Sequence, residues 1–436
     1  MWNRNRLHLC RLFTVVGVLV GLFPVRAPAV EKPNIVIVFT DDQGYGDLQC
    51  FGSETIRTPR IDQLAREGTR FTSFYAQVVC GPSRSALLTG RYPVRSGGWS
   101  MPAGEITIGE LLQKAGYTTG CFGKWDVSNR AAIPERMPNA KGFDYYWGTL
   151  GANDSARVIF HENNKEVGRS GDMASLTRIY TDKSIEFLEA NRDRPFFLYL
   201  AHTMVHSVID ASPKFKGKSQ GGLYGDTVEE LDYHTGRLLD ALDRLKLRDN
   251  TIVIFTSDNG GLIPKTNNAP LRSGKGFPYE GGIREPVIVR WPGVVEPGSV
   301  NHTPVTSVDY FPTICEIVGV DLPEGITIDG ESLTPLLKQT GTLEREDIFW
   351  HFPHYRGKVI PYSIIRSGDW KLLKRYDGTQ FELYNLKDDL SEENDLAESM
   401  PEKVKELDKK LRAYLKESGA HLPKINPDYE PAASSI

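Results

Sequence analysis

Cysteine is scarce in this chain. Five of its 436 residues are cysteines, and no two of them form a CxxC pair. Small exported proteins that depend on disulfides carry more cysteines, in even-numbered sets. Cys10 lies in an N-terminal segment that we expect to be removed. The pattern therefore predicts no disulfide framework and leaves Cys50, Cys80, Cys121 and Cys315 as separate thiols.

An excess of charge of one sign is also missing. The chain has 52 lysines and arginines against 56 aspartates and glutamates, a net charge of −4. Nucleic-acid-binding domains usually present a basic patch, so we expect no nucleic-acid partner. Since 40% of the residues are hydrophobic and 25% are charged, a chain of this length is expected to be globular, with a large domain and a smaller one.

Long apolar runs are absent except near the N-terminus. There Arg4, Arg6 and Arg11 precede an apolar run at 12–25, and small residues follow up to Ala29. This order is typical of a secretory signal peptide, so we predict that residues 1–29 are cleaved. The alternative is a membrane anchor, but the run is shorter than the roughly 20 residues that a spanning helix needs. We therefore expect a secreted or periplasmic protein without a membrane span after cleavage.

Short runs rich in Ile, Val, Phe and Leu alternate with helical patterns. Such runs are typical of buried, parallel strands. Two helical patterns begin with recognisable signals, Thr58 before Pro59 and Thr107 before its helix, and a longer helical pattern begins at residue 226. We therefore predict an α/β fold with a large, mostly parallel sheet between helices. The strands are expected at 34–39, 118–122, 195–201 and 251–256.

The pattern changes near residue 340. Beyond it, short alternating runs predict an antiparallel meander, which ends in an amphipathic helix at 401–418. We therefore divide the mature chain into a catalytic α/β domain at 30–340 and a smaller α+β subdomain at 341–436.

Polar side chains follow each of the predicted core strands. Asp41 and Asp42 follow the first strand, and Asp258 and Asn259 follow the last. Ligands of open α/β sheets bind beyond the carboxyl ends of the strands, so these groups are expected to meet. Oxygen ligands alone suit Ca²⁺ or Mg²⁺ better than zinc. The alternative is that the adjacent aspartates only cap helices or form turns.

Cys80 stands just before the segment PSRSALLTGR, in which Pro82 is placed for the first turn of a helix. A helix N-terminus favours an anion. Arg84 adds a permanent positive charge there, and Lys124 and Lys275 can join it if their loops converge. These residues predict a site for a tetrahedral oxyanion next to a divalent cation. Taken alone, Cys80 could equally be a small buried hydrophobic residue.

Several separated motifs resemble those of type I sulfatases, a family of the alkaline phosphatase-like superfamily. The segment CGPSRSALLTGR at 80–91 is similar to the family signature, in which the cysteine is oxidised co-translationally to Cα-formylglycine. The resemblance extends over nearly the whole mature chain, and it is strongest to N-acetylgalactosamine-6-sulfatases and arylsulfatase A. The other motifs are VIVFTDDQGYGDL, CFGKW, TSDNGG, GKGFPYEGGIREPVIVRWPG, RSGDWKLLKRY and FELYNLKDD.

This resemblance implies a mechanism and two partners. Hydrated formylglycine at Cys80 would attack the sulfur of a sulfate ester, give a covalent sulfoenzyme and later eliminate sulfate. Ca²⁺ would be held by the four oxygen ligands together with the modified Cys80, and Arg84, Lys124 and Lys275 would neutralise the sulfate oxygens. A formylglycine-generating enzyme and a sulfated carbohydrate, either a polysaccharide or a glycosaminoglycan, are the implied partners.

Histidines and one aspartate complete the predicted chemistry. His206 matches the family histidine that contacts the scissile ester, and it could protonate the leaving alcohol. The chain departs from the family two residues later, with Val208 in place of proline, and again at Asp126, where the family has histidine. We hypothesise that Asp126 is the base of the elimination step or orients the formylglycine. His202 is a candidate for substrate binding, although a structural role explains it equally well.

The rim of the pocket is expected to select the substrate. His351, His354 and Arg356, with Tyr355 between them, offer stacking surface and donors for sugar hydroxyls or a second sulfate. A solvated loop at a domain edge is the alternative. The segments 95–100 and 151–164 are further candidates for the rim.

Two other functions remain open from the sequence. One is a phosphodiesterase or phosphonate monoester hydrolase of the same superfamily, and the other is a silent homologue that binds sulfated glycans without cleaving them. The intact Cys80, Arg84 and oxygen ligands favour the sulfatase, whereas Asp126 keeps the silent homologue possible. The sugar, the sulfate position, the oligomeric state and the choice between exo and endo action are open as well.

Overall fold

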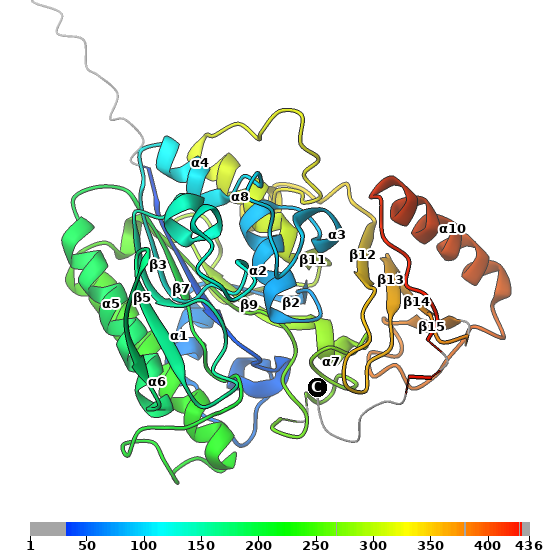
Figure 1. Ribbon diagram of the computed structural model, residues 1–436, viewed down its shortest axis with the longest axis horizontal. Coiled ribbons are helices and arrows are strands. Elements are labelled where there is room, and N and C mark those ends of the chain that lie inside the picture. Colours follow the sequence, from blue (N-terminus) through cyan, green and yellow to red (C-terminus); the bar gives the residue numbers. More distant parts are fainter. Residues whose placement is uncertain (1–31, 267, 379–380, 427, 430–436) are drawn as a thin grey trace, which may run out of the picture. The chain divides into compact units, whose positions relative to one another are not determined.

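The computed structural model describes residues 32–266, 268–378, 381–426 and 428–429 (Figure 1). The predicted signal peptide at 1–29 lies outside the described residues. No helix among those described is long and apolar enough to cross a membrane.

Four parallel strands form the centre of the large sheet. They are β8 (Thr251–Ser257), β1 (Asn34–Thr40), β7 (Phe196–Ala201) and β3 (Thr118–Lys124), adjacent in that order. Every residue of β1, β7 and β8 is buried, which explains their unbroken apolar sequences. All four strands were predicted from the sequence, and the structure confirms them.

The sheet continues on both sides of this centre. On one side β4 is parallel to β3, and the antiparallel β5 and β6 follow. On the other side β9 is antiparallel to both β8 and β2, and β2 pairs with the short β10 and β11. The sheet is therefore parallel in the middle and mixed at its edges. The added strands are β2 (Thr69–Tyr75), β4 (Tyr145–Thr149), β5 (Val158–Glu162), β6 (Lys165–Ser170), β9 (Arg284–Arg290), β10 (Ser299–Asn301) and β11 (Val305–Thr306).

Helices cover both faces of this sheet. Alternate side chains of β1 point to opposite faces, so that Ile35 and Ile37 pack in one apolar cluster and Val36 and Val38 in another. The first cluster includes side chains of α2, α4 and α8, and the second includes side chains of α1, α5 and α6. These helices are α1 (Pro59–Glu67), α2 (Cys80–Thr89), α4 (Ile108–Lys114), α5 (Leu176–Asn191), α6 (Gly222–Arg244) and α8 (Tyr310–Val318).

The structure has helices at the three predicted starts, and two of these starts differ in detail from the prediction. Thr107 caps α4 with a full capping box, in which its side chain accepts from the Glu110 amide. Thr58 is at the N-cap of α1, but its hydroxyl bonds to Asp62 and Gln49 and caps no amide of the first turn. Helix α6 begins at Gly222, four residues before the expected start at 226. Short helices also occur at α3 (Pro93–Ser96), α7 (Glu280–Ile283) and α9 (Thr334–Leu337).

The C-terminal part forms a separate antiparallel sheet in the order β12-β13-β14-β15, as the sequence predicted. Helix α10 packs on one face of this sheet through Leu407 and Leu411 (Figure 1). The other face shares an apolar cluster with Tyr75 and Val79 of the large domain. The division at residue 340 stays a prediction. The elements are β12 (Asp347–Phe352), β13 (Tyr362–Ser367), β14 (Trp370–Arg375), β15 (Phe381–Asn385) and α10 (Pro401–Glu417).

Candidate active site

The carboxyl ends of the four central strands carry most of the polar residues that the sequence singled out. Asp41 and Asp42 follow β1, Asp258 and Asn259 follow β8, and Lys124 ends β3. Because these strands are neighbours in one parallel array, their ends meet at one edge of the sheet.

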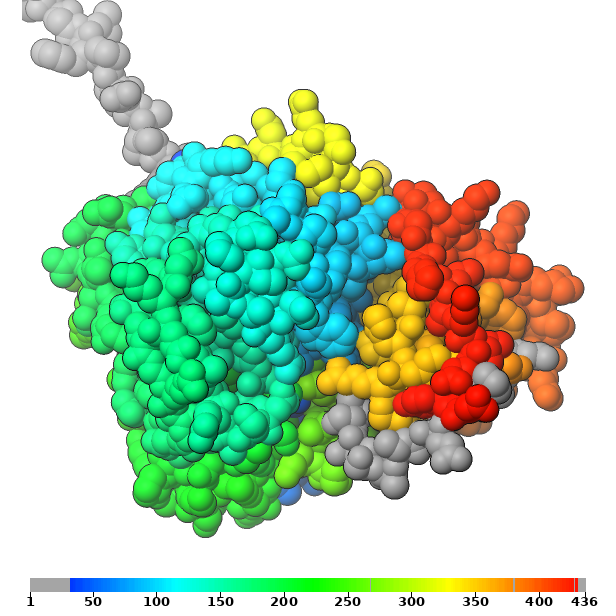
Figure 2. Space-filling model, in the orientation of Figure 1, coloured from blue at the N-terminus to red at the C-terminus, as the bar shows by residue number. Residues whose placement is uncertain are grey.

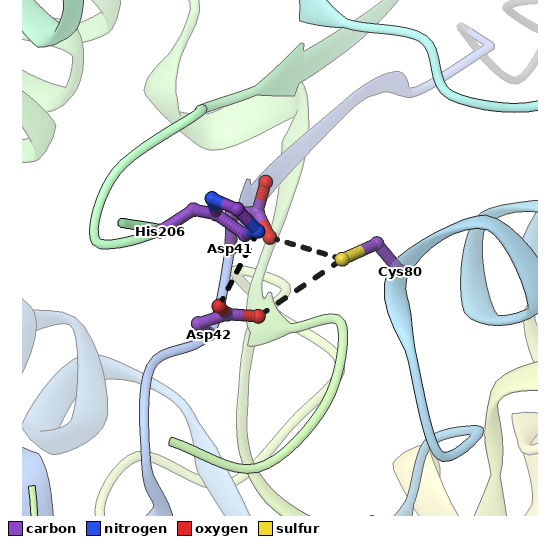
Figure 3. Close-up of side chains that lie close together, drawn as sticks. All are labelled: Asp41, Asp42, Cys80 and His206. Carbon is purple, nitrogen blue, oxygen red and sulfur yellow. Dashed lines mark hydrogen bonds and ion pairs between the residues drawn. The ribbon is translucent and has the colours of Figure 1, made fainter. Parts of the chain in front are cut away.

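Cys80 begins α2 and faces these strand ends (Figure 3). Its Sγ lies 3.4 Å from Asp41 Oδ1 and 3.9 Å from Asp42 Oδ1. Side-chain atoms of Asp41, Asp42, Cys80 and His206 all lie within 4.8 Å of one another, and all four residues are buried. The structure thus brings the predicted nucleophile position against the predicted metal ligands.

Three cations surround the same cluster. Lys124 Nζ lies 2.6 Å from Asp41 Oδ2, and Lys275 Nζ lies 2.8 Å from Asp42 Oδ2 and 3.4 Å from Cys80 Sγ. Arg84 Nη2 donates to Asp258 Oδ2 at 2.9 Å, while its Nη1 donates to the carbonyl of Lys124 at 2.9 Å. Arg84 therefore ties α2 to both β8 and β3. This arrangement supplies fixed positive charge for an oxyanion in a site from which water is largely excluded.

Close backbone packing sets the positions of Cys80 and Lys124. Gly123 has φ +107°, and a Cβ on it would lie 1.9 Å from the carbonyl oxygen of Ala201 on β7. Only glycine fits there, so Lys124 leaves the sheet at a fixed point. A Cβ on Gly81 would lie 2.1 Å from the Trp99 ring. Trp99 therefore covers the first turn of α2 next to Cys80.

Burial and the surrounding charges shift the ionisation of the cluster. Burial and the charge of Asp41 raise the pKa of the Cys80 thiol well above its usual value. Burial would raise the pKa of Asp41, but Lys124, His206 and Arg84 outweigh it and hold that pKa far below its usual range. Burial and the neighbouring Asp41 raise the pKa of Asp258. A bound cation would favour the ionised form of all these carboxylates.

The donor set fits a hard divalent cation. The carboxylates of Asp41 and Asp42 already converge, and Asp258 Oδ1 accepts from the Asp42 amide at 3.1 Å. Asn259 Nδ2 donates to Asp42 Oδ1 at 2.8 Å, while its buried Oδ1 has no hydrogen-bond partner among the described residues. A buried carbonyl oxygen without a partner is a suitable ligand. His206 also reaches this cluster, although the sequence predicted only that it contacts the scissile ester of the substrate.

His206 lies between the buried Asp42 and the half-exposed Asp154. Its Nε2 is 3.7 Å from Asp42 Oδ2 and 3.5 Å from Asp154 Oδ1, and its Nδ1 is 2.6 Å from the carbonyl of Ser207. Burial and Lys275 lower the pKa of His206. Since the Ser207 carbonyl can only accept, it places the proton on Nδ1 and turns Nε2 toward the pocket.

Asp126 is fully buried and belongs to the same network. Its Oδ1 accepts from Arg130 Nε at 2.8 Å, and its Oδ2 lies 3.5 Å from Lys124 Nζ without a hydrogen-bond partner among the described residues. Arg130 thus holds one oxygen, while the acceptor capacity of the other is not used by the described residues. This geometry is compatible with the hypothesised orienting or base role, which stays a prediction.

His202 differs from the other candidates. Its ring is fully buried, packs 6.4 Å from the Tyr180 ring centroid, and has no hydrogen-bond partner in the part of the chain that the structure describes. Burial lowers its pKa to about 3, so it stays neutral. These surroundings favour the structural alternative over substrate binding.

Two of the C-terminal candidates, His351 and His354, line a cavity of about 270 Å³ beside the first turn of α2. The His354 ring lies 6.4 Å from the Trp99 ring, and the Arg356 guanidinium lies 5.5 Å from it. Both ring nitrogens of His351 already have partners, Ser363 Oγ and the His421 carbonyl. On the face shown in Figure 2 the gold segment near residue 350 meets the blue segment near 95. His354, Arg356 and Trp99 can thus contact a ligand beyond the cluster, whereas His351 is occupied.

Sequence reasoning missed Arg130 and Asp154, which lie next to Asp126 and His206. The segment 151–164 was expected at the rim, but nothing in the sequence distinguished Asp154 within it. Arg130 lies four residues after Asp126, but this spacing indicates a charge pair only on a helix, and residues 126–130 form a loop.

A sulfatase family model matches residues 33–320, and the model of the N-sulphoglucosamine sulphohydrolase C-terminal domain matches residues 273–420. The first match covers more than half of the chain. The chain belongs to the sulfatase family. It is therefore a sulfuric ester hydrolase, as the sequence motifs predicted.

Curated sulfatases are similar over most of their length. N-acetylgalactosamine-6-sulfatase of Rattus norvegicus is 36% identical over 388 residues, which cover 79% of this chain and 72% of the relative. Arylsulfatase A of Homo sapiens is 37% identical over 383 residues, with coverages of 78% and 74%. Steryl-sulfatase of Mus musculus is 32% identical over 439 residues, with coverages of 78% and 70%.

Solved structures share the fold. Ps i-CgsB in complex with k-i-k-neocarrahexaose has a TM-score of 0.79 and 30% identity, and the match covers 92% of this sulfatase and 96% of that chain. A protein solved with its substrate D-glucosamine-2-N,6-O-disulfate has a TM-score of 0.76 and 25% identity, with coverages of 92% and 100%. A phosphonate monoester hydrolase from Silicibacter pomeroyi has a TM-score of 0.72 at 18% identity, with coverages of 89% and 96%, which shows the shared fold alone.

Proposed function

We propose that this sulfatase removes sulfate from a sulfated carbohydrate, with a formylglycine derived from Cys80 as nucleophile and Ca²⁺ as the metal. The observation that carries the proposal is the position of Cys80 among Asp41, Asp42 and Lys275. Burial and Asp41 raise the pKa of this thiol, which disfavours an ordinary thiolate nucleophile. A cysteine in these surroundings is better explained as the precursor of another group.

The residues around Cys80 have complementary roles in this proposal. Asp41, Asp42, Asp258 and Asn259 would hold Ca²⁺, which when bound would orient the nucleophilic hydroxyl and lower its pKa. The hydrated aldehyde would supply one hydroxyl for attack on sulfur and a second whose deprotonation releases sulfate. Arg84, Lys124 and Lys275 would bind the sulfate oxygens as negative charge redistributes.

Proton transfers are assigned to two further side chains. His206 Nε2 faces the pocket, and in the imidazolium form, which carries a proton on each ring nitrogen, it would protonate the leaving alcohol. Asp126 Oδ2 would orient the nucleophile or accept its second proton. The carbohydrate class is supported by the ligand and the substrate bound in two similar structures and by the name of the N-acetylgalactosamine-6-sulfatases. Export through the predicted signal peptide is part of the same proposal, since it would bring the enzyme to polysaccharides outside the cell.

Release of inorganic sulfate tests the proposal directly. The enzyme is co-expressed with a formylglycine-generating enzyme, conversion of Cys80 is checked by peptide mass, and a panel of sulfated oligosaccharides is supplied with Ca²⁺. We expect sulfate release from one class of oligosaccharide and none from a Cys80→Ala variant. Release of phosphate from phosphoesters instead would favour the phosphonate hydrolase alternative, and binding of glycan without turnover would favour a silent homologue.

A further inference from the structure

A chain of charged side chains leads from the buried cluster to the surface. Arg130 donates from Nε to Asp126 Oδ1 at 2.8 Å and from Nη1 to Asp154 Oδ2 at 2.6 Å. The second oxygen of Asp154 lies 3.5 Å from His206 Nε2. The Asp126 side chain is fully buried, whereas those of Arg130 and Asp154 are 39% and 54% exposed. This row of side chains therefore reaches solvent next to His206 Nε2, the nitrogen that we expect to contact the leaving oxygen.

The backbone that carries Arg130 is conformationally strained. Asp126, Asn129 and Arg130 have φ values of 56°, 55° and 56°, in the left-handed region that non-glycine residues avoid. Such conformations are strained and persist where the surroundings enforce them, commonly at functional sites. Here the Asn129 amide donates to the Trp99 carbonyl at 2.7 Å, and the Arg130 side chain packs against Gly151.

We propose that Asp154 and Arg130 recognise the sugar that carries the scissile sulfate. This inference rests on the proposed function. In this proposal the leaving oxygen lies at His206 Nε2. Asp154 Oδ1 is 3.5 Å from the same nitrogen, so it can contact the sugar substituent next to the leaving oxygen. A half-exposed carboxylate accepts hydrogen bonds from hydroxyl groups and repels a second sulfate at that position. Arg130 positions Asp154 and offers its remaining N–H groups to the ring oxygens.

The ionisation of Asp154 agrees with this role. Partial burial would raise its pKa, but His206 and Arg130 outweigh burial, and the pKa of Asp154 lies below its usual value. Asp154 is therefore a charged acceptor throughout the neutral range.

The test compares substrates with and without a sugar. Converted full-length enzyme and its Asp154→Asn variant are assayed on 4-nitrophenyl sulfate, which has no ring hydroxyls, and on monosulfated sugars that include the 6-sulfates of galactose and N-acetylgalactosamine. For the preferred sugar we expect KM to rise about 10- to 100-fold in Asp154→Asn, the effect of losing a hydrogen bond to a charged group. The kcat for that sugar and the hydrolysis of 4-nitrophenyl sulfate are expected to stay within about threefold of the unaltered enzyme.

Asp182→Asn is the matched control, because Asp182 pairs with Arg178 and Arg237, both outside the site. A fall in kcat with unchanged KM would overturn the inference, since it would place Asp154 in the chemistry through His206. Equal losses on both substrates would overturn it too, and so would hydrolysis of 4-nitrophenyl sulfate without hydrolysis of any sugar, although the protein would still be a sulfatase. Inactivity of the converted, unaltered enzyme on every substrate would instead refute the proposed function.

Discussion

At the residue scale, His202 predicts a sensitivity of the fold to acid. Burial lowers its pKa from the usual 6.5 to about 3, so the unfolded chain binds a proton over this range while the folded chain does not. The contribution of neutral His202 to the free energy of unfolding is therefore complete above pH 6.5. This contribution falls by up to about 4–5 kcal/mol as the pH falls toward 3. His202→Phe should lose less stability than the unaltered enzyme between pH 6.5 and 4, measured by urea unfolding. Parallel stability curves for the two proteins would contradict this.

Asp126 gives a second prediction at this scale. If its free Oδ2 orients or deprotonates the nucleophile, Asp126→Ala should lower kcat for sulfate release by about 100- to 10,000-fold, the usual contribution of a general base. Asp126→His, which restores the family residue, is the matched variant and should retain more activity than Asp126→Ala. The measurement is steady-state kinetics on enzyme with equal formylglycine content, and unchanged turnover in Asp126→Ala would exclude the role.

At the scale of elements, a buried lysine of the small sheet pairs with a glutamate of helix α7. Lys371 on β14 lies 3.0 Å from Glu280 of α7 and 2.7 Å from Glu392, and all three side chains are at most 1% exposed. Burial would raise the pKa of Glu280, but Lys371, Arg284 and Arg366 hold it at about 2. Burial and the charge of Glu280 raise the pKa of Glu392. The small subdomain is thus attached to the large one by charge as well as by apolar contact.

Removing this lysine should loosen the subdomain. Lys371→Met leaves a buried carboxylate without its cation, which typically costs about 3–5 kcal/mol. We expect a clear fall in Tm by calorimetry. Lys405→Met on the exposed face of α10, whose partner Glu402 is exposed as well, is the control and should change stability by under about 1 kcal/mol. Similar Tm values for the two variants would show that the buried network contributes little.

At the scale of the whole molecule, metal binding should support the fold. Several carboxylates meet at one edge of the sheet, and a bound cation offsets their repulsion. A ligand at 100 times its Kd stabilises by about 2.7 kcal/mol, so chelation should lower Tm by several degrees, and CaCl2 should restore it better than MgCl2. Asp258→Asn should show a smaller response to both salts. An unaltered Tm after complete chelation, confirmed by metal analysis, would argue against a bound cation.

Much of this architecture could be predicted from the sequence, for reasons that differ between regions. The central strands are continuous apolar runs that only a doubly covered sheet can bury, and their ends carry Asp41 and Asp258, so the place of the site followed from the topology. Arg130 and Asp154 could not be foreseen, because left-handed backbone at 129 and 130 folds a polar loop that has no periodicity. Lys371 and Glu280 are likewise far apart in sequence, and only the docking of the two sheets brings them together.

The burial of Cys80 has a consequence for the order of events in the life of this protein. Its side chain is 2% exposed in the folded chain, behind Trp99 and between carboxylates. A modifying enzyme could reach it only while α2 and the strand ends were still apart. Conversion of Cys80 would then have to occur before the chain folds. A molecule that folds unconverted would stay unconverted. A cell with too little generating enzyme would accumulate two fixed populations, one active and one silent, with the same fold.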